Sequence, residues 1–306
     1  MKIKVLKFGG TSVGSVEAIK RSANIICDWS KKSKVIVVLS AMSGETDRLI
    51  NLTKSFSKSP NPVDFDNAIS TGENLSCALM SIYLNNQKTK SKSLHSWQIP
   101  IMTSSEHMKS RILSINKKFL LNELENLDVL VVPGFQGINE RREITTLGRG
   151  GSDTSAVAVA AAMDAECIIY TDVEGVFTTD PNIVPNAKKI NKISYEEMLE
   201  LASQGAKVLQ TRSVELAMRK NTKLSVRSSL KPKKIGTIIT DEKSVLEKNT
   251  VSGIAYTKDE AKITLSRVLD KPGVSSKIFG PLAKGNINVD MILQNISQDG
   301  KFANLS

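Results

Sequence analysis

Short apolar runs and amphipathic stretches alternate along the first part of the chain. The runs are rich in β-branched residues and almost continuously apolar, as in strands buried on both faces of a sheet. They are Ile3 to Phe8, Val35 to Leu39, Val129 to Val132 and Cys167 to Tyr170. Helical spacing between them predicts helices at Val16 to Trp29, Asp66 to Leu84, Met108 to Glu125 and Thr154 to Met163. This alternation predicts an α/β fold with a mostly parallel sheet covered by helices on both sides.

A second pattern of strand and helix begins near residue 260. Its predicted elements are a strand at Ala261 to Val268, a turn at Asp270 to Gly273, a helix at Val274 to Ala283 and a strand at Ile287 to Ile296. We therefore expect a first domain over 1–240, a linker over 241–260 and a partial second domain over 261–306. A lone strand-helix-strand is near the lower limit of about 40 residues for independent folding. We expect either a truncated chain or a partner that completes this domain.

Small and polar residues follow each of the four buried strands. Their loops are Gly9 to Ser12, Ser40 to Gly44, Gly134 to Gly137 and Asp172 to Gly175. Open α/β sheets bind ligands along the carboxyl edge of their strands. Four such loops together predict one shared site at this edge.

Composition narrows the class of protein. The 306 residues include 40% hydrophobic residues and carry a net charge of +11, which suits a globular chain of two domains. No run reaches the roughly 20 apolar residues of a membrane span, and no signal peptide precedes the first strand, so we expect a cytoplasmic location without a membrane partner. The lysines are dispersed without interleaved aromatics, which argues against nucleic acid. Three dispersed cysteines and two histidines offer no disulfide framework, zinc site or Ser-His-Asp triad.

The first glycine turn, Gly9-Gly10, follows a strand and precedes a helix. Glycines there let backbone N–H groups approach phosphate oxygens, and the helix dipole favours an anion. Lys7 lies beside the turn and could neutralise a transferring phosphoryl group. The alternative is a tight turn with a surface lysine. The spacing is not that of a Walker A loop.

The second glycine turn, Gly148 to Asp153, has three glycines in four residues and leads into a helix of small residues. It resembles an anion-binding nest, and Arg149 could clamp a carboxylate. Asp153 is either a first-turn acid or a group that orients Lys7 or a metal. Glu73 is likewise either a first-turn acid or a partner for a substrate ammonium.

No general base emerges from the sequence. A hydroxyl acceptor usually needs one, whereas a carboxylate is already ionised at neutral pH. Positioning and electrostatic stabilisation can then supply most of the catalysis. The residues therefore favour transfer of the γ-phosphoryl group of ATP to a carboxylate.

In combination, these motifs resemble the aspartate kinases of the amino-acid kinase superfamily, over essentially the whole chain. The motifs are Lys7 to Ser12, Ser40 to Gly44, Thr71 to Glu73, Pro133 to Gly137, Thr146 to Asp153, Thr171 to Pro181 and Gly205 to Leu209. The resemblance implies a three-layer αβα sandwich and the reaction of ATP with L-aspartate to give 4-phospho-L-aspartate, with Mg²⁺. This is the first step towards lysine, threonine and methionine.

The resemblance also implies roles for individual residues. The implied catalytic residues are Lys7 and Asp153. The implied aspartate contacts are Thr46, Glu73, Arg149, Gly150, Gly151 and Ser152. The implied nucleotide contacts are Lys7, Gly9, Gly10, Thr171, Asp172, Phe177, Asn182, Lys207 and Val208. Phe177 stands where the family often has tyrosine, and Gln210 where it often has histidine.

The C-terminal segment resembles the first ACT domain of the family, an α+β regulatory domain that is incomplete here. Asp270, Asn288 and Gln294 would lie near a regulatory amino acid, lysine or threonine, and we expect a homodimer or an assembly with a regulatory subunit. Three alternatives stay open. They are a sibling kinase acting on glutamate, N-acetylglutamate or UMP, an amino-acid-sensing regulatory subunit with little activity and, more remotely, a nucleic-acid-binding protein.

Overall fold

The computed structural model describes residues 2–99, 101–206, 208–241, 251, 253–256, 261–269, 271–285, 287, 289, 291–297 and 301–305. It divides into two compact units, Met1–Tyr256 and Thr257–Ser306. Most of the expected linker, namely 242–250, 252 and 257–260, lies outside the described residues. The domain boundaries expected from the sequence therefore stay predictions.

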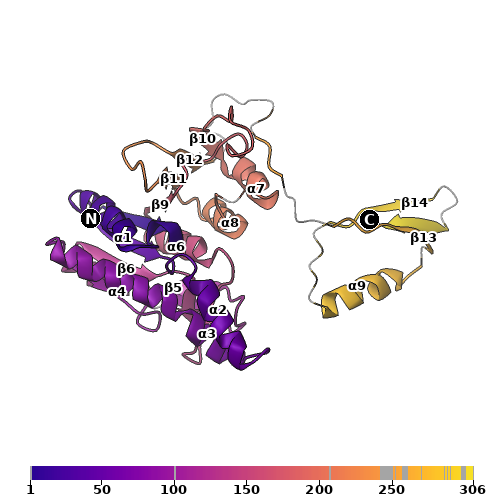
Figure 1. Ribbon diagram of the computed structural model, residues 1–306, viewed down its shortest axis with the longest axis horizontal. Coiled ribbons are helices and arrows are strands. Elements are labelled where there is room, and N and C mark those ends of the chain that lie inside the picture. The colour runs from indigo at the N-terminus through magenta and orange to yellow at the C-terminus, as the bar shows by residue number, and fades with distance from the viewer. Residues whose placement is uncertain are drawn as a thin grey trace. The chain divides into compact units, whose positions relative to one another are not determined.

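The centre of the first unit is a mostly parallel sheet (Figure 1). Its strands are β1 (Ile3–Phe8), β2 (Lys34–Leu39), β3 (Ser91–Ser93), β6 (Val129–Pro133), β9 (Glu166–Thr171), β10 (Lys192–Ser194), β11 (Leu224–Ser228) and β12 (Thr237–Thr240). Their order in the described sheet is β10-β12-β11-β9-β1-β2-β6-β3, in which only β11 and β12 pair antiparallel. In the register, Phe8 lies beside Leu39 and Tyr170, and Leu39 lies beside Pro133. The central strands therefore end at one common edge, as the sequence predicted.

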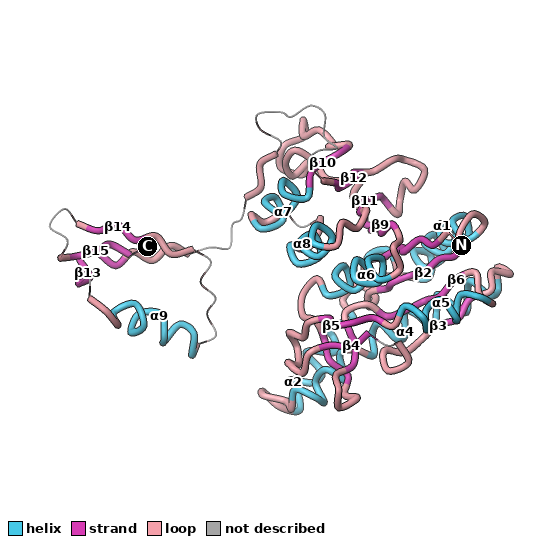
Figure 2. Tube along the Cα trace, turned by 180° about the vertical axis from the view of Figure 1, so that it is seen from behind, coloured by secondary structure: helices cyan, strands magenta, loops and turns pink. Residues whose placement is uncertain are grey.

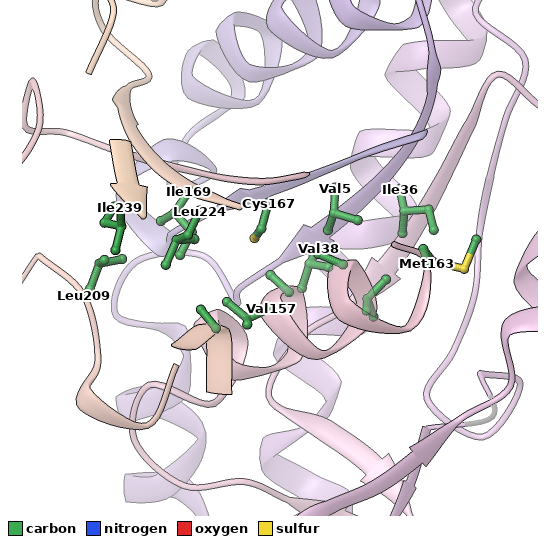
Figure 3. Packing of buried hydrophobic residues seen from close by; sticks show 14 of the residues in the cluster. Val5, Ile36, Val38, Val157, Met163, Cys167, Ile169, Leu209, Leu224 and Ile239 are labelled. Atoms are coloured by element: carbon green, nitrogen blue, oxygen red, sulfur yellow. The ribbon is translucent and has the colours of Figure 1, made fainter. Parts of the chain in front are cut away.

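Helices cover both faces of this sheet. The helices are α1 (Val16–Ser30), α4 (Thr71–Asn86), α5 (Lys117–Glu125), α6 (Gly151–Ala162), α7 (Tyr195–Ser203) and α8 (Thr211–Arg219). Leu6 of β1 belongs to an apolar cluster with residues of α1 and α4, whereas its neighbour Val5 belongs to a second cluster with residues of α5 to α8. Figure 3 shows Val157 of α6 below Val5 and Val38. This arrangement confirms the three-layer αβα architecture.

A smaller sheet and two helices border the carboxyl edge of the large one (Figure 2). The strands are β4 (Ile101–Thr103), β5 (Ile112–Ile115), β7 (Gln136–Ile138) and β8 (Ile144–Thr146), in the order β5-β4-β7-β8. The helices are α2 (Glu45–Phe56) and α3 (Pro62–Ile69), and a short 3₁₀ turn, η1 (Gly10–Ser12), follows β1. Leu49 of α2 packs against Phe65 and Ile69 of α3 in a separate apolar cluster.

Two predicted helices differ from the observed elements. The stretch Asp66 to Leu84 is two helices, α3 and α4, which meet at Ser70. The carbonyl of Ser70 accepts a hydrogen bond from Gln136 Nε2 at 3.0 Å, which satisfies a group at the break. The helix expected from Met108 is wrong in its first half, because Ile112–Ile115 is strand β5. Pairing with β4 overrides the local helical spacing there.

The second unit contains a three-stranded antiparallel sheet and one helix among its described residues. Its elements are β13 (Leu265–Leu269), α9 (Val274–Lys284), β14 (Gln294–Ile296) and β15 (Phe302–Leu305). The sequence predicted a strand-helix-strand and missed β15, which lies between the other two strands. The expected long strand from Ile287 is wrong in its extent, because β14 is the only strand among the described residues of that stretch.

Candidate functional site

A cavity of about 880 Å³ lies in the first unit, and its walls come from the loops at the carboxyl edge of the large sheet. The expected site residues among its lining are Lys7, Gly9, Gly10, Thr46, Glu73, Arg149, Gly150, Gly151, Ser152, Asp153, Thr171 and Val208. The structure therefore brings together residues that are up to 201 positions apart in the sequence. This gathering at one edge is what the strand-end loops predicted.

Lys7 and Asp153 form an ion pair inside this cavity. Lys7 lies in β1, between Val38 of β2 and Ile169 of β9, so the position of its backbone is fixed by two neighbouring strands. Its Nζ lies 2.7 Å from Asp153 Oδ1, and the two side chains are only 12% and 10% exposed. A lysine held this way presents its charge at a defined place, beside the bare backbone of Gly9.

The first glycine turn packs against the loop after β2. A Cβ added to Gly10 would lie 3.0 Å from the carbonyl oxygen of Ala41, which leaves little room for a side chain. Ser40, Ala41, Met42 and the next two residues of this loop also line the cavity. Glycine backbone therefore forms part of the cavity wall here, where the backbone N–H groups at the start of η1 can approach an anion.

Residues 147–152, which overlap the second glycine turn, are named the Arg149 turn below. Gly148 and Gly150 both adopt left-handed backbone angles, with φ of 78° and 70°, which favour glycine. Gly150 is the N-cap of α6 and makes no side-chain capping bond. Arg149 is exposed and lines the cavity, and within the described part of the chain it has no ion-pair partner. Its guanidinium is therefore available to an anionic ligand.

Glu73 is a buried carboxylate with unused hydrogen-bonding capacity. It lies in the first turn of α4 and is 3% exposed. Its Oε1 accepts a hydrogen bond from the backbone N–H of Ala41 at 3.1 Å, whereas Oε2 has no hydrogen-bond partner among the described residues. Burial raises the pKa of Glu73 to about 7, although the backbone N–H groups of Ala41 and Glu73 oppose the rise. A cationic ligand in the cavity would satisfy this carboxylate.

Several expected nucleotide contacts lie elsewhere. Asp172, Phe177 and Asn182 do not line the cavity, although Asp172 accepts a hydrogen bond from its lining neighbour Thr171 at 3.0 Å. Phe177 forms an isolated bridge with Lys189. Lys207 lies outside the described residues.

The expected regulatory residues belong to the second unit. Gln294 is the first residue of β14 and is exposed. Asp270 and Asn288 lie outside the described residues. The regulatory site stays a prediction.

Sequence reasoning missed a buried polar centre behind one wall of the cavity. Asp66 of α3 is fully buried, and its carboxylate accepts four hydrogen bonds. The donors are His107 Nδ1 at 2.8 Å, the backbone N–H of Met108 at 3.1 Å, and the backbone N–H and hydroxyl of Thr146 at 3.0 and 2.6 Å. Met108 and Thr146 both line the cavity. The sequence offered one signal for this centre. Asp66 directly follows Phe65, at a position that helical spacing predicts to be buried.

Two further observations concern metal ions and membranes. In the described ranges, no group of three His, Cys, Asp or Glu side chains is arranged to hold a metal ion. None of the helices within those ranges has the length and apolar character needed to cross a membrane.

Comparison with known proteins places the chain in context. Residues 2–228 match the amino acid kinase family, and residues 263–306 match the ACT domain. An aspartate kinase of Pseudomonas putida is 50% identical over 302 residues, which are 98% of this chain and 73% of that protein.

Solved structures agree with this match. An aspartate kinase from Synechocystis is 40% identical with a TM-score of 0.70, over 100% of this chain and 52% of that chain. Escherichia coli aspartokinase III, solved with lysine and aspartate, is 25% identical with a TM-score of 0.74 over 99% of this chain and 78% of that chain.

Proposed function

The chain belongs to the aspartate kinases of the amino acid kinase family, and we propose that its cavity binds ATP and L-aspartate side by side. The γ-phosphoryl group of ATP is transferred to the β-carboxylate of aspartate, which gives 4-phospho-L-aspartate and ADP. The observation that carries this proposal is that, in the described part of the chain, one cavity is lined by a guanidinium without an ion-pair partner and by a carboxyl group with one unbonded oxygen. Within the described residues, Arg149 has no ion-pair partner and Glu73 Oε2 has no hydrogen-bond partner.

This charge pattern is complementary to an amino acid. Arg149 has two parallel N–H donors that suit a carboxylate, and the ionised Glu73 suits an ammonium group. We assign Thr46 and the backbone of Gly150 to Ser152 to the remaining polar groups of aspartate. We place the acceptor carboxylate near Lys7, which lines the same cavity.

The transfer needs no general base. An ionised carboxylate oxygen of aspartate attacks the γ-phosphorus, the bond from that phosphorus to the β,γ-bridging oxygen breaks, and the electron pair leaves with ADP. The ammonium of Lys7 stabilises the charge on the transferring group. Asp153 holds that ammonium in place through the ion pair at 2.7 Å. Positioning and electrostatic stabilisation are the chemistry that these residues can supply.

The nucleotide is assigned to the side of the cavity formed by Gly9, Gly10, Thr171 and Val208. We also keep the sequence-based assignment of its remaining contacts, namely Asp172, Phe177, Asn182 and Lys207. Mg²⁺ is usually bound through one or two carboxylates together with phosphate oxygens and water. Asp153 fits this donor set, and the ion would neutralise phosphate charge when bound.

Regulation by an amino acid is the second part of the proposal. E. coli aspartokinase III was solved with lysine, so lysine is the first candidate effector, with threonine the alternative. Asp270, Asn288 and Gln294 are assigned to this site, in a regulatory domain over 261–306 that follows the catalytic domain 1–240 and the linker 241–260. A cytoplasmic location and a homodimer, or assembly with a regulatory subunit, stay predictions.

An acceptor screen tests the proposed reaction. The protein is incubated with ATP, Mg²⁺ and hydroxylamine, which traps acyl phosphates as hydroxamates. We expect a hydroxamate from aspartate and none from glutamate or N-acetylglutamate. A product from glutamate alone would contradict the assigned acceptor. If ATP binds but no acceptor reacts, the chain would instead be an amino-acid-sensing subunit with little activity.

A further inference from the structure

Arg212 bridges two backbone carbonyls that are distant in sequence. It lies in the first turn of α8, with its Nη1 donating to the carbonyl of Leu147 at 2.9 Å and its Nη2 donating to the carbonyl of Ser110 at 2.8 Å. A planar guanidinium can hold two acceptors in a fixed relative orientation, which a lysine ammonium cannot do. No step of the proposed reaction uses this residue.

One of these carbonyls lies in the Arg149 turn, and the other belongs to a residue that bonds to the chain directly before the turn. Leu147 is the first residue of the turn, directly before the left-handed Gly148. Ser110 donates to the carbonyl of Thr146 twice, from its backbone N–H at 3.0 Å and from its hydroxyl at 2.9 Å. Arg212 therefore fixes the chain at the point where the ordered β8 strand passes into the turn.

The start of α8 also restricts the other end of the turn. Gln210, the N-cap residue of α8, lines the cavity and packs on Gly150. A Cβ added to Gly150 would lie only 2.0 Å from Gln210 Cγ. The Arg149 turn is thus held by two hydrogen bonds near its beginning and by close packing near its end.

We propose that Arg212 is a positioning residue for the phosphoryl acceptor, because it fixes the backbone from which Arg149 reaches the substrate. This inference rests on the proposed function, in which Arg149 binds aspartate. Without the bridge, the turn has more conformations in the free protein, and aspartate binding must order it. Loss of Arg212 therefore weakens aspartate binding without removing any group that contacts ATP or aspartate.

The test compares Arg212→Ala with a control on the same helix. Arg219, in the last turn of α8, pairs with Glu215 at 2.8 Å on the surface, where the two side chains are 67% and 54% exposed. Arg219→Ala removes the same charge and leaves the Arg149 turn untouched. The measurements are the KM for aspartate, the KM for ATP and kcat, together with the Kd for aspartate from calorimetry.

For Arg212→Ala we expect the aspartate KM and Kd to rise about 10- to 100-fold, the range of lost hydrogen bonds from a charged donor. The ATP KM should stay within about twofold, and Arg219→Ala should match the wild type. Millimolar guanidinium should partly restore aspartate binding to Arg212→Ala, because the free ion can bridge the same carbonyls. Arg212→Lys, which keeps the charge but not the planar fork, should fall between the wild type and Arg212→Ala.

An unchanged aspartate Kd in Arg212→Ala would overturn the inference. So would equal losses for aspartate and ATP that guanidinium does not reverse, since these indicate a general loss of folding. If Arg212→Ala does not fold, Arg212→Lys carries the test, and a wild-type aspartate Kd in that variant would count against the bridge. A wild-type protein that gives no aspartyl hydroxamate would contradict the proposed function, whereas a wild-type hydroxamate yield with an unchanged variant Kd would contradict this inference alone.

Discussion

Replacing Glu73 with glutamine should make the protein more stable above neutral pH. Glu73 is 3% exposed and Oε2 has no hydrogen-bond partner among the described residues. Ionising this carboxyl inside the protein therefore costs free energy that the unfolded chain does not have to supply. Glutamine has the same shape as the protonated carboxyl, and its side-chain oxygen can still accept the hydrogen bond from Ala41.

The magnitude follows from the pKa of Glu73, which burial raises from 4.5 to about 7. A folded pKa above the unfolded one means that the folded state binds the proton more tightly. That stabilisation is fully present below pH 4.5 and is lost as the pH rises through about 7. The complete loss corresponds to about 3 kcal/mol of unfolding free energy. We expect Glu73→Gln to gain most of this at pH 8 and less than about 1 kcal/mol at pH 5.

Urea unfolding of both proteins at pH 5 and pH 8, without aspartate, measures the difference. The control is Glu17→Gln at the start of α1. There the backbone N–H of Glu17 and the hydroxyl of Ser15 lower the pKa, so the substitution removes stabilisation above the unfolded pKa and its effect has the opposite sign. A Glu73→Gln difference that is the same at both pH values would refute the reasoning.

The same carboxyl should link aspartate binding to protons. At pH 7 about half of the free protein carries a proton on Glu73, and binding an ammonium group should release it. Calorimetry in buffers of different ionisation enthalpy should therefore detect about half a proton released per aspartate at this pH. No proton release in wild type, or the same release in Glu73→Gln, would count against Glu73 as the ammonium partner.

Lys7→Ala should lower kcat about a hundredfold or more while the aspartate KM changes little, because Lys7 stabilises the transferring group; steady-state rates near wild type would contradict this role. Asp66→Asn should lower the unfolding free energy by about 3 kcal/mol, since an amide nitrogen would meet donors that now bond to a carboxylate. Urea unfolding measures this loss. A loss below about 1 kcal/mol would show that the centre does not depend on the second carboxylate oxygen. Gly150→Ala should weaken aspartate binding because of its φ of 70° and its contact with Gln210; calorimetry should show partial recovery in the double variant with Gln210→Ala, and no recovery would assign the loss to the backbone alone.

Local sequence patterns were enough to predict the parts of the site that lie at strand ends and glycine turns. The apolar runs predicted β1, β2, β6 and β9 to within one residue at each end. The loops after these strands then had to meet at one edge, because parallel neighbours end together. The placement of Lys7 near the Arg149 turn followed from that topology rather than from any contact that could be read in the sequence.

Long-range polar contacts were out of reach for the same reasoning. Asp66 meets Thr146 across 80 positions, and Arg212 meets Ser110 across 102. Neither Asp66 nor Arg212 stands in a motif, and each looks like an ordinary polar residue of a helix. Strand β5 was missed because Ile112 and Ile115 have a spacing of three, which a helix and a short paired strand can share.

The break between α3 and α4 at Ser70 restricts the number of residues that can separate Asp66 from Glu73. Asp66 and Glu73 are seven residues apart, so one uninterrupted helix would direct both toward the same side. With the break, Asp66 receives four hydrogen bonds while Glu73 receives one from Ala41. A single inserted or deleted residue in this segment would turn one helix by about 100° and disconnect one carboxylate from its donors. We therefore expect the number of residues between these two carboxylates to tolerate less change than the identity of the residues between them.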